Sequence, residues 1–156
     1  MALAITPFTG LCGFTPLDKI AVHLLSSPEF AALIPTTISE KFISIASSST
    51  PDGPEEKTAL RHVFTALVMA DKNTVKIELQ KLTQRLARGD VREGEAEIRD
   101  LVLRLNQQFP GDIGIFCPFM LNYVKLSPGE AMFLGAGEPH AYVSGGQTQT
   151  QNFHAM

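Results

Sequence analysis

Two residues near the C-terminal end of the sequence have side-chain types and a spacing that could do chemistry. His140 and Tyr142 are two residues apart in the segment Pro-His-Ala-Tyr-Val-Ser at 139–144. Alternate residues of a strand lie on one face, so a strand over 140–144 would place His140, Tyr142 and Ser144 together. A histidine on an inward face beside a tyrosine could ligate a metal or contact a sugar.

The spacing around His140 supplies only one candidate metal ligand. Catalytic zinc is normally held by three protein ligands, with one position open for water or substrate. No second His, Cys or Glu cluster lies near His140 at ligand spacing. A lone histidine beside a turn is more often a surface or hydrogen-bonded structural residue, and the pattern alone leaves both interpretations open.

The segment before His140 predicts several short strands. Strand-forming residues cover 119–126, a Ser-Pro-Gly-Glu turn follows at 127–130, a second apolar run covers 131–134, and a Gly- and Pro-containing turn fills 135–139. Closely spaced short strands of this kind favour part of an antiparallel sandwich or barrel.

Apolar residues at helical spacing predict at least four amphipathic helices between residues 15 and 109. We expect these helices to bury their apolar stripes against each other. Thr15 is the expected cap of the first helix, with Pro16 at its first position, and Pro35 is expected to end the short helix that follows. A mobile loop is expected at 47–54. Thr74 and Gly89 should begin and end a later helix, and Pro110 should stop the last one.

Composition is typical of a small soluble protein. The chain has 156 residues, of which 44% are hydrophobic, and this is enough for the core of one domain. Its net charge of −3 gives no basic footprint for nucleic acid, and no apolar run approaches a membrane span. We expect no secretory signal, a cytoplasmic location, and buried, reduced thiols at Cys12 and Cys117, with a disulfide as the minor alternative.

Three stretches of the sequence carry a resemblance to a known family. They are MALAITPF with GLCGF at 1–14, PGDIG at 110–114, and YVKLSPGEAMFLGAGEPHAYVSG at 123–145. Here the chain resembles type I mannose-6-phosphate isomerase, also called phosphomannose isomerase, a zinc enzyme of the cupin class. The resemblance covers residues 1 to 145 and is more specific at both ends than in the middle.

The resemblance implies a role for two residues of this chain. In the family, zinc is held by a Gln and a His of a Gln-x-His-Pro segment, by the Glu of a Lys-Pro-Glu segment, and by the His of the Pro-His-Ala-Tyr turn. Only the last of these is in this sequence, as His140. Tyr142 matches the tyrosine of the same turn that contacts substrate, and we assign no catalytic residue.

The resemblance also implies a fold and a domain division. We expect an α+β protein, with partial cupin-type β-barrel or jelly-roll strands and an inserted α-helical subdomain. The expected parts are a cupin segment at 1–14, the helical insertion at 15–109, and cupin strands at 110–145. Residues 146–156 form a polar tail unlike the family, which would continue into an Arg-Ala-Gly-Leu-Thr-Pro-Lys segment. The chain therefore resembles an internal or truncated piece of the family's enzyme. A shortened gene product, an alternative splice form and an incomplete gene model are the three explanations.

The implied activity is interconversion of mannose 6-phosphate and fructose 6-phosphate, which feeds GDP-mannose and glycan synthesis. Zinc would polarise the sugar oxygens while an acid/base pair moves a proton between C1 and C2. With three of four ligands missing, we expect little or no activity from this chain. One alternative is a non-catalytic binding or regulatory module whose helical face meets another protein, such as a full-length isomerase, and exposed strand edges would also allow such pairing. The other is a fragment without a role.

The remaining polar residues are interpreted structurally. We expect His23 and His62 to be packing or boundary residues and Asp112 to cap a turn or a short helix after Gly111, and we assign no role to His154. Five arginines alternate with acids and are interpreted as a solvated helix face, with a phosphate-binding patch as the alternative: Arg85, Arg88, Arg92, Arg99 and Arg104.

Overall fold

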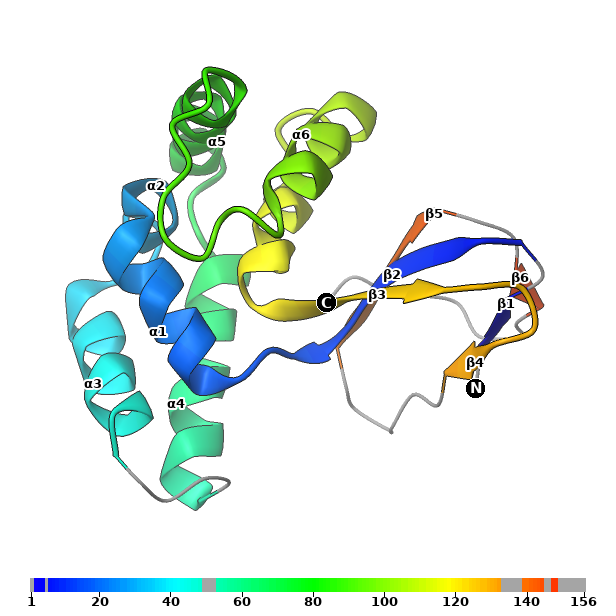
Figure 1. The fold of residues 1–156 in the computed structure, drawn as a ribbon. Helices are drawn as coiled ribbons and strands as arrows, with labels where there is room; N and C mark the ends of the chain where they lie inside the picture. The colour runs from blue at the N-terminus through cyan, green and yellow to red at the C-terminus, as the bar shows by residue number, and fades with distance from the viewer. Residues whose placement is uncertain (1, 5, 49–52, 133–138, 145–146, 149–156) are drawn as a thin grey trace. The chain divides into compact units, whose positions relative to one another are not determined.

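The computed structural model describes residues 2–4, 6–48, 53–132, 139–144 and 147–148. For residues 2, 3, 132, 140–144, 147 and 148 it describes the main chain only. The chain divides into two compact units (Figure 1). A sheet unit contains Met1–Thr15 and Met120–Met156, and a helical unit contains Pro16–Phe119.

The sheet unit contains two three-stranded antiparallel sheets. In one, β2 (Phe8–Phe14) lies between β3 (Leu121–Leu126) and β5 (His140–Ser144). In the other, β1 (Ala2–Ala4) lies between β4 (Ala131–Met132) and β6 (Gln147–Thr148). Both sheets therefore join the N-terminal residues to strands more than 100 positions later in the chain.

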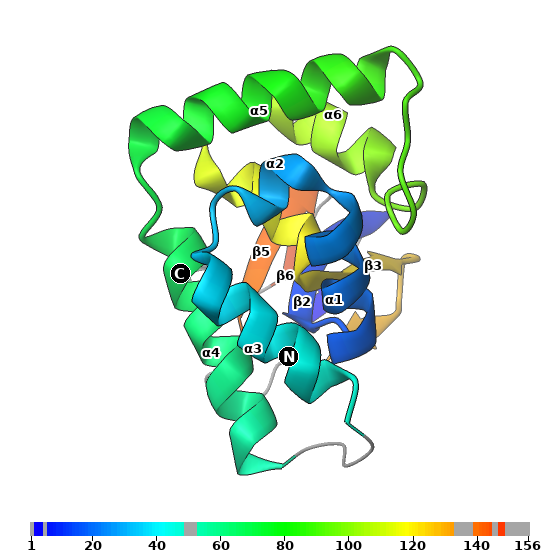
Figure 2. The ribbon, with the colours of Figure 1, turned by 90° about the vertical axis from the view of Figure 1, so that its left-hand side faces the viewer.

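The helical unit contains six α-helices and one 3-10 helix in its described part. The helix α3 packs against α1 and α4, and α5 packs against α2 and α6 (Figure 2). The bounds are α1 Leu17–Ser26, α2 Pro28–Ala31, α3 Thr36–Ala46, α4 Pro54–Val68, α5 Lys72–Ala87, α6 Arg99–Gln108 and the 3-10 helix η1 Ile113–Phe119.

Two of the predicted helix caps are wrong. Pro16 occupies the N-cap position of α1 without a side-chain cap hydrogen bond, and Thr15 lies one position before it. The residue that caps α5 is Asp71, whose Oδ2 accepts hydrogen bonds from the N–H and the hydroxyl of Thr74. These two bonds lower the pKa of Asp71, and Thr74 lies inside the first turn.

The core of the helical unit is built from the predicted apolar stripes and from aromatic residues of η1. The rings of Phe30, Phe116 and Phe119 form a cluster with centroid separations of 5.1 to 6.4 Å. Phe109, which follows α6 at helical spacing from Leu105, is 53% exposed and does not belong to this core. The other buried apolar residues include Ile20, Leu24, Phe42, Val63, Leu67, Val75, Leu79, Leu82, Leu86, Leu101, Val102 and Leu105.

The predicted combination of helices and strands is confirmed, and a cupin barrel stays a prediction. The described strands form two open sheets and close no barrel. Residues 113–119 form η1 ahead of β3, so the strand predicted from residue 119 begins at Leu121. Within the described ranges, no helix is both long and apolar enough to span a membrane.

Some predictions fall on residues outside the described ranges. They concern the middle of the loop at 47–54, the strand end at 133–134, most of the turn at 135–139, and His154 in the tail. The domain division at 15–109 and 110–145 stays a prediction. The chain passes from one compact unit to the other at Thr15/Pro16 and at Phe119/Met120.

Candidate functional site

The main chain of β5 places His140 and Tyr142 at the edge of a three-stranded sheet, beside β2. Cys12 is the register partner of His140, Leu11 of Ala141, and Gly10 of Tyr142. The predicted strand over 140–144 is therefore confirmed. The roles of His140 as a metal ligand and Tyr142 as a substrate contact stay predictions.

An irregularity in β2 lies beside Pro139, the residue before His140. Leu11 pairs with Tyr123 and Phe14 pairs with Leu121, so two residues of β2 face the single residue Asn122. This is a β-bulge, which bends a strand and redirects its hydrogen-bonding groups. At the bulge, the N–H of Gly13 donates a 2.9 Å hydrogen bond to the carbonyl of Pro139.

The described residues do not fit a complete metal site. Among them, no group of three or more His, Cys, Asp or Glu could hold a metal ion. Because catalytic zinc normally needs three protein ligands, His140 alone does not make a zinc centre.

The most strongly built polar cluster lies within the helical unit, at Arg85. Its guanidinium binds Glu29 through Nε and Nη2 at 2.9 Å each, and it binds Glu95 through Nη1 at 2.8 Å and Nη2 at 2.6 Å. All three side chains are buried. The interpretation of Arg85 as a residue of a solvated face is therefore wrong, because its charge is neutralised by two carboxylates in the core.

The electrostatics of this cluster favour the ionised forms. Burial alone would raise the pKa of Glu95, but hydrogen bonds from Arg85, Ser27 and the N–H of Arg92 outweigh it and lower the pKa. Hydrogen bonds to Glu95 and Glu29 raise the pKa of Arg85. The donors of Arg85 that face Glu29 and Glu95 are committed to these pairs, so this residue does not supply a phosphate-binding patch.

His23 is a buried structural residue, as predicted. Its Nδ1 lies 2.9 Å from the carbonyl of Phe119, and its Nε2 lies 3.0 Å from the carbonyl of Gly94. The imidazole therefore ties α1 to the end of η1 and to the loop after α5. His62 lies on α4 and is exposed.

The two cysteines differ in burial, and neither forms a disulfide. Burial, with a smaller contribution from the charge of Asp112, raises the pKa of the Cys117 thiol to about 11. Cys117 is thus the buried residue that we predicted, and its raised pKa keeps the thiol in the unreactive protonated form. Cys12 is half-buried, so its prediction as a fully buried residue is wrong.

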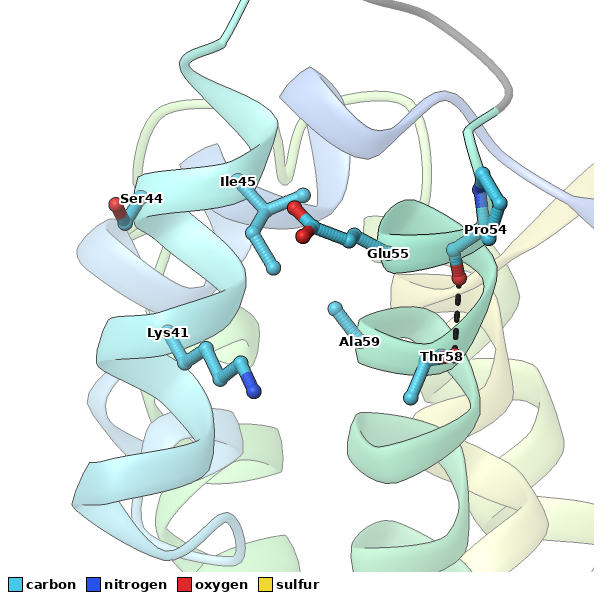
Figure 3. A pocket seen from close by; sticks show the side chains of 7 residues that line it. All are labelled: Lys41, Ser44, Ile45, Pro54, Glu55, Thr58 and Ala59. Carbon is cyan, nitrogen blue, oxygen red and sulfur yellow. Dashed lines mark hydrogen bonds between the residues drawn. The ribbon is translucent and has the colours of Figure 1, made fainter.

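A groove of about 450 Å³ lies between α3 and α4 (Figure 3). Lys41 of α3 and Glu55 of α4 point into it from opposite walls. The hydroxyl of Thr58 is already bonded to the carbonyl of Pro54. Most of its lining is exposed and its polar groups do not converge on one point, so the groove does not have the features of a small-molecule site. The lining residues are Lys41, Ser44, Ile45, Pro54, Glu55, Thr58 and Ala59.

Sequence reasoning missed Gly13, and also Glu29 and Glu95 as partners of Arg85. The glycine in Leu-Cys-Gly-Phe is the only local signal for the bulge, because glycine is common at such irregularities. No local signal could find the pairing of Arg85 with Glu29, which are 56 positions apart.

The chain is similar to known proteins that all carry the same family name. A family model described as phosphomannose isomerase type I, helical insertion domain, matches residues 33–121. The mannose-6-phosphate isomerase of Cryptococcus neoformans is 41% identical over 93% of this chain and 37% of its own length. The Saccharomyces cerevisiae enzyme of that name is 37% identical over 93% of this chain and 35% of its own length.

Solved structures give the same result. The apo form of mannose 6-phosphate isomerase from Salmonella typhimurium matches with a TM-score of 0.68 at 28% identity, over 94% of this chain and 33% of that one. A zinc-bound mannose 6-phosphate isomerase matches with a TM-score of 0.69 at 27% identity, over 94% and 32%. The chain spans about a third of the length of the curated relatives it matches. It belongs to the type I phosphomannose isomerase family.

Proposed function

We propose that this chain is one portion of a zinc-dependent mannose-6-phosphate isomerase, which interconverts mannose 6-phosphate and fructose 6-phosphate and feeds GDP-mannose and glycan synthesis. The observation that carries the proposal is the match to enzymes of that name along 93% of the chain. The zinc-bound state of one solved neighbour supports the choice of metal.

Within this portion, we assign His140 as one zinc ligand and Tyr142 as a substrate contact. Their position on β5 supports this assignment, because residues two apart on a strand share a face. The sequence contains neither a Gln-x-His-Pro nor a Lys-Pro-Glu segment. The remaining ligands would therefore come from segments that this sequence does not contain, and the strands would belong to a cupin barrel.

The chain by itself should have little or no isomerase activity. One imidazole does not provide the chelation that holds zinc against competing ligands. The test is a coupled assay of the purified chain with added zinc, in which formation of fructose 6-phosphate is followed. We expect no turnover above a blank without protein, and turnover near that of the complete Saccharomyces cerevisiae relative would contradict the proposal.

A second function is a non-catalytic module that pairs with a full-length isomerase. The observation in its favour is that β3 and β5 are edge strands within the described sheet. An exposed strand edge can pair with another strand through its main-chain groups. Size-exclusion chromatography with light scattering shows whether pairing occurs. The chain is measured alone and after mixing with the Saccharomyces cerevisiae relative. A stable mixed complex supports pairing, and two unchanged peaks contradict it.

A further inference from the structure

The bulge in β2 depends on the backbone conformation of one glycine. Gly13 has a φ of +68°, in the left-handed region. A side chain with a Cβ rarely adopts this conformation, because the Cβ approaches the following carbonyl oxygen. The conformation lets β2 accommodate two residues opposite Asn122, while the Gly13 N–H reaches the carbonyl of Pro139 at 2.9 Å.

We propose that Gly13 is a positioning residue for His140. The contact acts on the residue immediately before His140, and Cys12, which is adjacent to Gly13, is the register partner of His140. Gly13 therefore fixes the point at which the chain enters β5. The importance of this role for catalysis rests on the proposed function, in which His140 is a zinc ligand.

The bond from Gly13 is important because Pro139 has no N–H. At a proline, the main chain can join a neighbouring strand only through its carbonyl. Pro139 is buried, so its carbonyl must find a partner within the protein. If residue 13 moved to a negative φ, its N–H would turn away and the carbonyl before His140 would lose this donor.

A second left-handed glycine in the same unit supplies a matched control. Gly129 has a φ of +90°, and its N–H donates a 2.8 Å hydrogen bond to the carbonyl of Ala4. It lies in the turn between β3 and β4, where a Cβ would meet nothing within 4 Å. Alanine at either position introduces the same kind of strain, but only Gly13 contacts the residue before His140.

The experiment compares the full chain with the variants Gly13→Ala, Gly13→Asn and Gly129→Ala. Hydrogen exchange is measured at the amides of residue 13 and of 140–144, and the imidazole signals are recorded by NMR. The His140 signals are assigned by their loss in His140→Gln. Asparagine tolerates the left-handed region better than alanine, so Gly13→Asn should restore part of the native behaviour.

We expect Gly13→Ala to shift the His140 ring signals and to speed exchange at these amides roughly 5- to 30-fold, as a loss of local stability of this kind allows. In Gly129→Ala, the His140 signals should stay in place. Equal shifts in Gly13→Ala and Gly129→Ala, or no shift in either, would overturn the role of Gly13. If Gly13→Ala does not fold, the same comparison is made with Gly13→Asn and Gly129→Asn.

These measurements need neither zinc nor turnover. If His140 is not a zinc ligand, its ring signals will still respond to Gly13→Ala, and only the proposed function fails. If the signals do not respond while the isomerase proposal holds, only the positioning role fails.

Discussion

The N–H of Thr15 donates a 2.8 Å hydrogen bond to the carbonyl of Met120. These two residues are the last of the sheet unit before the helical unit begins and the first after it ends. The chain thus leaves and re-enters the sheet unit at two hydrogen-bonded positions. An insertion whose ends are this close can be added or removed with little change in the path of the host chain.

The segment Pro16–Phe119 should therefore fold on its own. We expect helical circular dichroism and cooperative thermal unfolding from it. A segment that ends at residue 109, the boundary predicted from sequence, should be unfolded or much less stable. It lacks Phe116 and Phe119, and loss of one buried aromatic ring costs about 3–5 kcal/mol. Equal stability of the two segments would show that η1 does not belong to the helical core.

Replacement of Arg85 should strongly destabilise the helical unit. Arg85→Met leaves Glu29 and Glu95 as neighbouring buried carboxylates, and removal of one member of a buried charge cluster costs about 3–5 kcal/mol. Arg92→Met is the matched control, because the Arg92 guanidinium lies 3.9 Å from Asp90, with side chains that are 46% and 58% exposed. Such a surface pair contributes about 0–1 kcal/mol. Urea unfolding of both variants measures the difference, and similar midpoints would contradict it.

The same cluster makes the stability of the chain depend on acid. The pKa of Glu95 is lower in the folded chain than in the unfolded chain, where it is about 4.3. Ionised Glu95 therefore adds to the free energy of unfolding above the unfolded pKa. This stabilisation is lost as the pH falls through the folded pKa. In Glu95→Gln this part of the pH dependence should be absent, although the variant is less stable at neutral pH. Urea midpoints between pH 2 and pH 7 measure this, and parallel pH curves for the two proteins would refute the assignment.

Cys117 should be nearly inert in the folded chain. With a pKa of about 11, roughly one thiol in a thousand is ionised at pH 8, and the side chain is buried. We expect iodoacetamide to modify Cys117 only after unfolding, as followed by peptide mass spectrometry. Unfolded chain provides the control for intrinsic reactivity. Rapid modification of Cys117 in folded protein would mean that η1 opens readily.

Local patterns were enough to predict the strand that carries His140, because Gly and Pro residues precede it in the sequence and it contains Tyr142 and Val143, which favour strands. They were also enough for the apolar stripes of the helices. The caps were harder, because Thr15 and Thr74 each have a suitable residue type. Asp71 is the actual cap of α5 because its carboxylate lies three residues before the Thr74 N–H, within hydrogen-bonding distance.

Relationships across the chain could not be predicted in this way. The residues next to Arg85 in the sequence are typical of a surface arginine. Its charge is compensated in the core by Glu29, which lies on α2 and is distant in the sequence. The role of Gly13 depends on strands that follow it by more than 100 residues. Pairing of this kind is set by tertiary packing, which carries no periodic signal in the local sequence.

In the proposed function, this chain contributes one zinc ligand, His140, to a site completed by segments that it does not contain. The most direct test is zinc stoichiometry after the chain is co-purified with the flanking segments of the Cryptococcus neoformans relative. We predict no retained zinc for the chain alone, about one zinc per complex with the native chain, and a large loss of zinc with His140→Gln. One zinc per chain without the flanking segments, or unchanged zinc in the His140→Gln complex, would contradict the assignment of His140 as a zinc ligand.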